Sequence, residues 1–173
     1  MNYLTHQELA TWLDHLAQEQ TLIAPLDIAG NILYRPVSDT KEVVWDFVRS
    51  FMSVKEVFFP PTERLMLMEK IGQQVALTET LPEGNTIIFG VRPCDARGLL
   101  TFDALFIENE PVDPYYARRR ENTTLIGLAC QSVGASCFCT NVGGAPDDPT
   151  GMDIMLTASD GGYVVEIITE KGE

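Results

Sequence analysis

The chain has 173 residues, of which 45% are hydrophobic and 21% charged, a composition typical of a globular protein rather than a disordered one. Its 12 basic and 25 acidic residues give a net charge of −13, which argues against a nucleic-acid partner and against docking on an anionic membrane. The length suits one domain, and we expect residues 1–173 to form a single α/β domain.

No targeting segment is visible in the sequence. The N-terminal residues MNYLTHQELATWLDHL lack the basic and apolar regions of a signal peptide, and no apolar stretch reaches the roughly 18 residues of a membrane-spanning helix. We therefore expect a cytoplasmic protein without membrane insertion, in which thiols stay reduced. Clustered cysteines in that compartment mark metal or redox sites more often than structural disulfides.

The N-terminal part predicts a helix followed by a β-hairpin. Thr5 and Glu8 form a capping-box pattern, and the helically spaced leucines after them predict a helix over about 6–18. Two apolar runs within 21–36 predict the hairpin, with residues 30–31 (Gly-Asn) in its turn.

The next part gives weaker patterns. Residues 39–52 are amphipathic and predict a second helix. Pro60 should interrupt regular structure in the segment after it. A short helix or strand is expected over 65–68. Met66 and Met68 alternate with leucines there, and we expect both to pack in the core.

The C-terminal half predicts a central, mostly parallel sheet. Strands at about 86–91 and 123–129, with a helix from Asp95 to about 107 between them, form a βαβ unit with a right-handed crossover. Residues 152–157 and 162–168 predict a closing hairpin.

All four cysteines lie within one 46-residue stretch of this half. Cys94 follows the first strand of the βαβ unit, Cys130 follows the second, and Cys137 and Cys139 lie in the loop after it. Because the carboxyl ends of parallel strands open on one edge of the sheet, we expect the four thiols at that edge.

Three interpretations of the cysteines remain open on the residues alone. Thiolates select zinc or iron–sulfur clusters, although the spacing matches neither a zinc knuckle nor a ferredoxin motif. Alternatively, Arg92, Arg97 and a helix N-terminus lower the pKa of Cys94 for thiol chemistry, although His6 and His15 lie too far away to serve as its base. The cysteines could also be packing residues only.

Other candidate sites are few. The basic run at 118–120 could bind an anionic cofactor or an acidic neighbouring protein, or be a solvated helix face. The sequence contains no paired carboxylates, HExxH or GxGxxG, so we expect no catalytic residues.

The motifs FFPPTE, RPCD and CFCT, together with DPYYARRREN and GYVVEIITEKG, resemble one family over nearly the whole chain. The chain is similar to a family of iron–sulfur electron-transfer subunits found in anaerobic sulfite reductase and, as the beta subunit, in sulfhydrogenase-type nickel–iron hydrogenases. The resemblance implies an accessory subunit that carries electrons between a flavoprotein and a catalytic subunit. It also implies a following domain with two ferredoxin motifs, which this sequence does not include.

The resemblance does not by itself assign a cluster to Cys94, Cys130, Cys137 and Cys139. Our hypothesis from their spacing is a [4Fe–4S] site, with charge balance from Arg92 and Arg97 and backbone N–H donors at the Asp95 helix start. A weaker similarity to the beta subunits of coenzyme F420-reducing hydrogenases leaves a flavin as a further cofactor hypothesis. A docking module with zinc-bound or free cysteines is the rival interpretation.

Overall fold

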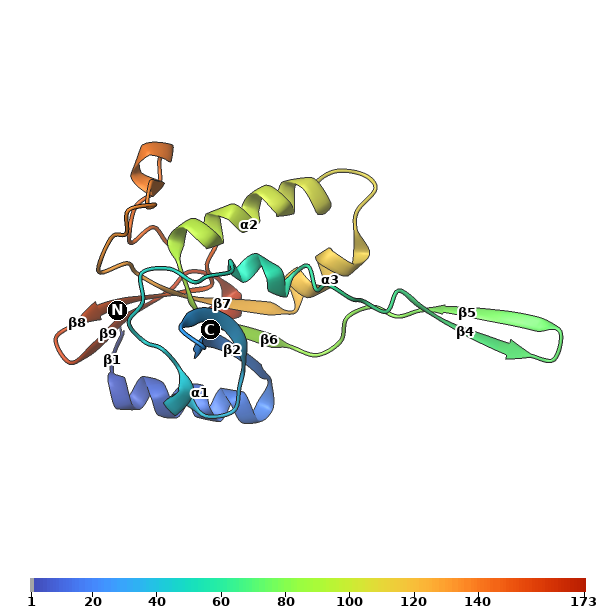
Figure 1. Ribbon diagram of the computed structural model, residues 1–173, viewed down its shortest axis with the longest axis horizontal. Helices are drawn as coiled ribbons and strands as arrows, with labels where there is room; N and C mark the ends of the chain where they lie inside the picture. The colour runs from blue at the N-terminus through green and yellow to red at the C-terminus, as the bar shows by residue number, and fades with distance from the viewer. Residues whose placement is uncertain (1) are drawn as a thin grey trace.

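A seven-stranded sheet forms the centre of the computed structural model, which describes residues 2–173. One helix covers one face of this sheet and two helices cover the other, giving three layers (Figure 1). The sheet order is β1-β9-β8-β7-β6-β2-β3, and a separate two-stranded sheet is formed by β4 and β5. The elements are β1 (Asn2–Thr5), α1 (His6–Glu19), β2 (Thr21–Ile28), β3 (Asn31–Val37), β4 (Met66–Ile71), β5 (Gln74–Glu79), β6 (Thr86–Val91), α2 (Pro93–Phe106), α3 (Pro114–Glu121), β7 (Thr123–Leu128), β8 (Ile154–Ser159) and β9 (Gly162–Ile167).

The middle of the sheet is parallel and its two margins are antiparallel. Strands β2, β6, β7 and β8 run in the same direction, while β3 pairs antiparallel with β2, and β9 pairs antiparallel with both β8 and β1. The predicted α/β class, the βαβ unit and both hairpins are thereby confirmed. The edge strand β1 and the short helix α3 were not predicted, because four and eight residues carry too little periodicity to be recognised.

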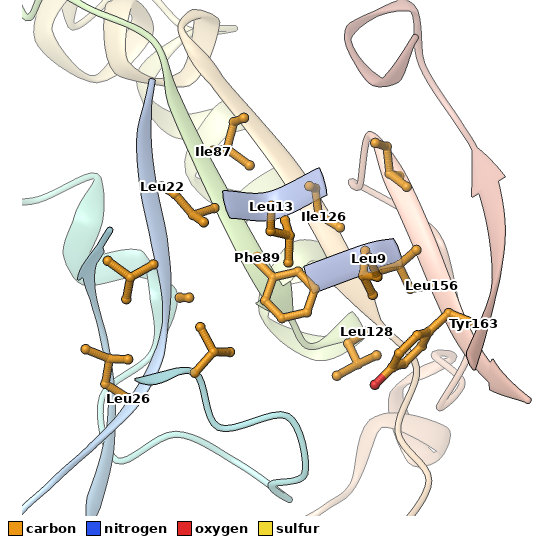
Figure 2. Close-up of a cluster of buried hydrophobic side chains, with 14 residues drawn as sticks. Leu9, Leu13, Leu22, Leu26, Ile87, Phe89, Ile126, Leu128, Leu156 and Tyr163 are labelled. Carbon is orange, nitrogen blue, oxygen red and sulfur yellow. The ribbon is translucent and has the colours of Figure 1, made fainter. Parts of the chain in front are cut away.

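Helix α1 covers one face of the sheet. The capping box of Thr5 and Glu8 begins it as the sequence predicts. Leu9 and Leu13 are its fully buried residues, and they meet apolar side chains of β2, β6, β7, β8 and β9 (Figure 2).

Helices α2 and α3 cover the opposite face. Leu99 of α2 and Tyr116 of α3 are buried there beside Ile88 and Leu125 of the central strands. Pro93 and Pro114 each stand in the first turn of their helix, where a missing N–H costs nothing. Apolar residues on both faces explain why β6 and β7 read as continuous apolar runs.

The predicted helix over 39–52 is wrong. Only Thr40–Glu42 form a 3-10 turn, and the chain then runs along the β2–β3 hairpin. Val43 bridges Leu26, and the N–H of Val44 donates to the carbonyl of Pro25 at 2.8 Å. Backbone bonds to a neighbouring strand thus replace helical ones, in a segment whose β-branched residues favour helices weakly.

The expected core position of Met66 and Met68 is also wrong. Both lie in the β4–β5 hairpin, which extends away from the central sheet (Figure 1), and they are 57% and 70% exposed. The hairpin turn of β2–β3 is shifted by one residue from the expected position. Ala29 and Gly30 form it with φ of 53° and 83°, and Asn31 already belongs to β3.

None of the helices within residues 2–173 is both long enough and apolar enough to cross a membrane.

Candidate functional site

The carboxyl ends of β6 and β7 bring Cys94 and Cys130 to one edge of the sheet. The two strands are parallel neighbours, with Val91 paired to Gly127 near their ends. Cys94 lies in the first turn of α2, and Cys130 lies two residues beyond β7. The predicted shared edge for these two cysteines is confirmed.

Cys137 and Cys139 lie in the loop that follows, and short backbone contacts shape it. The N–H of Gly134 donates to Sγ of Cys137 at 3.2 Å, and the N–H of Cys137 returns to the carbonyl of Gly134 at 3.0 Å. The N–H of Cys130 donates to the carbonyl of Pro146, which closes the loop at its base. All four cysteines are free thiols, and Cys94 and Cys137 are exposed.

The four thiols influence one another electrostatically. Partial burial raises the pKa of Cys94, and the negative charges of Asp95, Cys130 and Cys139 raise it further, while the N–H of Asp95 lowers it. Burial likewise raises the pKa of Cys130, with contributions from Cys137 and Cys139. The predicted lowering of the Cys94 pKa is therefore wrong.

Arg92 is the buried cation of this edge, with only 5% of its surface exposed. Its guanidinium donates to the backbone carbonyls of Leu128 and Ala129 at 3.2 and 3.3 Å and to that of Phe47. It also lies beside Cys130, whose pKa it lowers against the rise that burial causes. Among residues 2–173, its Nε is the one buried side-chain nitrogen or oxygen without a hydrogen-bond partner.

Arg97 and Asp95 have other partners. Arg97 donates to Asp148 at 2.9 Å and to the carbonyl of Gly143 at 2.5 Å, so it joins α2 to the end of the cysteine loop. Asp95 accepts a hydrogen bond from the Ser53 hydroxyl at 2.6 Å. Of the two arginines expected to balance negative charge at the cysteines, Arg92 is the one that influences a thiol pKa.

Within the described part of the chain, no three or more His, Cys, Asp or Glu side chains converge closely enough to hold a metal ion as they stand. The donor set nevertheless fits a soft metal, because all four cysteines are free thiols and those of the loop are near enough to influence the pKa of Cys94 or Cys130. The orphaned Nε of Arg92 adds an unused donor beside Cys130. Ligation by all four would require the exposed loop to close over Cys94 and Cys130.

A cavity of about 280 Å³ opens next to this edge, close to the roughly 300 Å³ at which small-molecule pockets begin. The rings of His6 and Trp45 in its lining lie 4.3 Å apart. The sequence does not reveal this cavity, because its lining comes from five separate segments that share no motif. The lining residues are His6, Trp45, Asp46, Phe47, Arg92, Leu128, Ala129, Gln131, Ser132 and Tyr163.

The basic run at 118–120 serves the fold. Arg120 pairs with Asp103 of α2 at 3.1 Å, and Arg119 pairs with Glu63. Arg118 pairs with Glu121 within α3 itself. Arg119 and Arg120 are mostly buried in these ion pairs. They therefore form neither the expected anion site nor a solvated helix face.

Comparison with known proteins relates the chain to one hydrogenase subunit. It is 31% identical over 161 residues to sulfhydrogenase 2 subunit beta of Pyrococcus furiosus, and the alignment covers 93% of this chain. The chain spans 46% of that relative's length. No family model and no solved structure matches the chain. No comparison bears on the resemblance to the anaerobic sulfite reductase subunits, which stays a prediction. Over most of its length this chain is therefore related to a hydrogenase beta subunit.

Proposed function

We propose that this chain is part of an electron-transfer subunit of a hydrogenase-type oxidoreductase complex, and that Cys94, Cys130, Cys137 and Cys139 bind a [4Fe–4S] cluster. The observation that supports the proposal is that Cys94 and Cys130 lie at one sheet edge, that the loop with Cys137 and Cys139 is near enough to influence their pKa values, and that buried Arg92 lies beside Cys130. Such a cluster, when bound, accepts and releases single electrons. The relative's name, which describes a subunit of a hydrogenase, agrees with a redox role.

The residues around the thiols would favour their ionised form. The charge of Arg92 already opposes the rise in the Cys130 pKa, and the N–H of Asp95 opposes the rise in the Cys94 pKa. Hydrogen-bond donors of this kind, together with burial, set the potential of a thiolate-bound site. Asp95 acts in the opposite sense through its negative charge.

The surface next to the thiols suits contact with another protein of a complex. Val133, Phe138 and Val142 of the cysteine loop are 76%, 65% and 60% exposed. We call these three residues the apolar rim. A partner seated on the apolar rim would bury it and exclude water from the thiols. Other subunits of an oxidoreductase complex are the partners we propose, in keeping with a relative that is itself named as a subunit.

Anaerobic reconstitution with iron and sulfide tests this function. We expect bound iron and a paramagnetic signal on reduction in the wild type. Cys130→Ser should lose both, whereas Ser136→Ala, which alters the same loop without removing a thiol, should keep both. A wild-type protein that takes up no iron would refute the cluster.

The rival function is a docking module whose cysteines bind zinc or no metal. The observation in its favour is that, within residues 2–173, the thiols do not converge as they stand. It predicts that Cys→Ser changes disturb folding or the assembly of the complex. The electron-transfer function predicts instead that assembly survives these changes while electron transfer is lost.

A further inference from the structure

The β4–β5 hairpin is a ribbon that nothing in residues 2–173 covers. Its strands, Met66–Ile71 and Gln74–Glu79, form a sheet of their own, and all twelve strand residues are exposed. We call residues 66–79 the arm; it projects from the body of the molecule in Figure 1. A single two-stranded hairpin is marginally stable in water, so the arm needs a surface to pack against.

The base of the arm is fixed to the body. The hydroxyl of Tyr115 on α3 donates to the carbonyl of Leu65 at 2.6 Å, and the N–H of Thr80 donates to the same carbonyl at 3.2 Å. Arg119 of α3 pairs with Glu63 just before the arm. These contacts hold the arm in a defined direction and leave its length free for a partner.

The arm is apolar on both faces. The register places Met68 opposite Leu77, and Met66 and Val75 share their face. Leu67 and Ile71 lie on the other face. These six side chains are 44–70% exposed, an apolar surface that monomeric proteins seldom leave uncovered.

The low charge of the arm and its length allow a second copy of this chain as the occupant. The arm carries one lysine and two glutamates, Lys70, Glu69 and Glu79, whereas the whole chain has a net charge of −13. Six residues per strand extend about 20 Å, and surface charges are screened beyond roughly 8 Å at physiological salt. Two arms can therefore pack side by side while the acidic bodies stay apart.

The area also suits a dimer. One twofold contact buries one face of the arm, where four large apolar side chains of roughly 100 Å² each give on the order of 400 Å² of apolar surface per copy. Apolar atoms make up only about 57% of a typical interface, so the total area approaches the about 800 Å² per partner of a stable one. A second copy brings a matching surface, because twofold symmetry sets like patches against each other. We propose that the arm is a dimerisation element that packs against the arm of a second copy. This interface is independent of the proposed electron-transfer role.

Sedimentation velocity of the whole chain over a range of concentrations tests the dimer. We expect twice the monomer mass at about 100 µM and dissociation on dilution. Met68→Glu places a charge at the centre of the arm on both copies and should raise the dissociation constant at least about 100-fold. Leu105→Glu adds the same charge at an exposed leucine of α2 and should leave the dimer intact.

Two results would overturn the proposal. One is a wild-type protein that sediments as a monomer at about 100 µM. The other is a Met68→Glu protein that stays as dimeric as Leu105→Glu. Circular dichroism of both variants shows whether the body remains folded, which we expect because Met68 and Leu105 lie outside the two cores.

Discussion

Arg92 lies over the ring of Phe47, with its guanidinium carbon 4.0 Å from the ring centroid. The same guanidinium donates to the Phe47 carbonyl and to the carbonyls at the end of β7. A segment expected to be helical thus holds the one buried arginine of the described residues next to Cys130. The cation–π contact and the three backbone acceptors explain how the charge is kept under the cysteine edge without a carboxylate.

Replacing Arg92 should destabilise the fold. Arg92→Met leaves the buried carbonyls of Phe47, Leu128 and Ala129 without their donor, and we expect a loss of about 2–4 kcal/mol in the free energy of unfolding. Arg97→Met is the matched control. Its pair with Asp148 is more exposed, so the loss should stay below about 1 kcal/mol. Urea denaturation measures both, and equal losses would contradict the structural role of Arg92.

The raised thiol pKa values predict slow alkylation at neutral pH. Burial and then the charge of Asp95 raise the pKa of Cys94 above its ordinary 9.0, so its reaction with iodoacetamide should become fast only above that pH. Asp95→Asn removes the charge, keeps an acceptor for Ser53, and should speed alkylation of Cys94 several-fold at pH 8. Asp160→Asn, far from the thiols in sequence, should change nothing. Peptide mass spectrometry reads the rates, and identical profiles for all three proteins would exclude the influence of Asp95.

The same pKa shifts determine in which direction the stability of the folded protein changes with pH. A thiol whose pKa is higher in the folded state than in the unfolded state contributes stability below the unfolded value, near 9.0, and loses it as pH rises through the folded value. The unfolding midpoint should therefore fall at alkaline pH, and less steeply in the Cys94→Ser, Cys130→Ser double variant. A double variant with an unchanged slope would show that other groups cause the fall.

Close packing in the sheet predicts opposite effects at two glycines. A Cβ at Gly127 of β7 would overlap Sδ of the buried Met152, so Gly127→Ala should cost about 1–3 kcal/mol unless Met152→Ala makes room. At Gly98 of α2 the nearest atom is the flexible Nζ of Lys55 at 3.1 Å. Gly98→Ala should therefore stabilise the protein by roughly 0.5–1 kcal/mol through helix propensity. Thermal unfolding compares them, and a tolerated Gly127→Ala would contradict the packing.

The elements predicted from sequence are those whose signals are local. Neighbouring residues alone define the capping box of Thr5 and Glu8 and the apolar runs at 86–91 and 123–128. The helix and both strands formed as expected. Residues 43–52 did not form the expected helix, because Val43 and Val44 meet a strand that is distant in sequence. No local pattern can reveal such a contact.

The candidate site, too, was predictable from the sequence only in part. The edge position of Cys94 and Cys130 follows from parallel strands and was predictable, as was the candidate status of Arg92. The partners of Arg92 and Arg97 depend on Phe47 and Asp148, which lie 45 and 51 residues away. Met66 and Met68 were misplaced because an exposed apolar hairpin has the same alternation as a buried one.

A thiol titration before and after anaerobic reconstitution shows whether the four cysteines act as one site. The folded apoprotein should react with a disulfide reagent at all four cysteines. After iron and sulfide are added, a shared cluster should protect Cys94, Cys130, Cys137 and Cys139 together, and all four should become reactive together when the iron is removed. Four thiols that remain freely reactive in the reconstituted protein would contradict it.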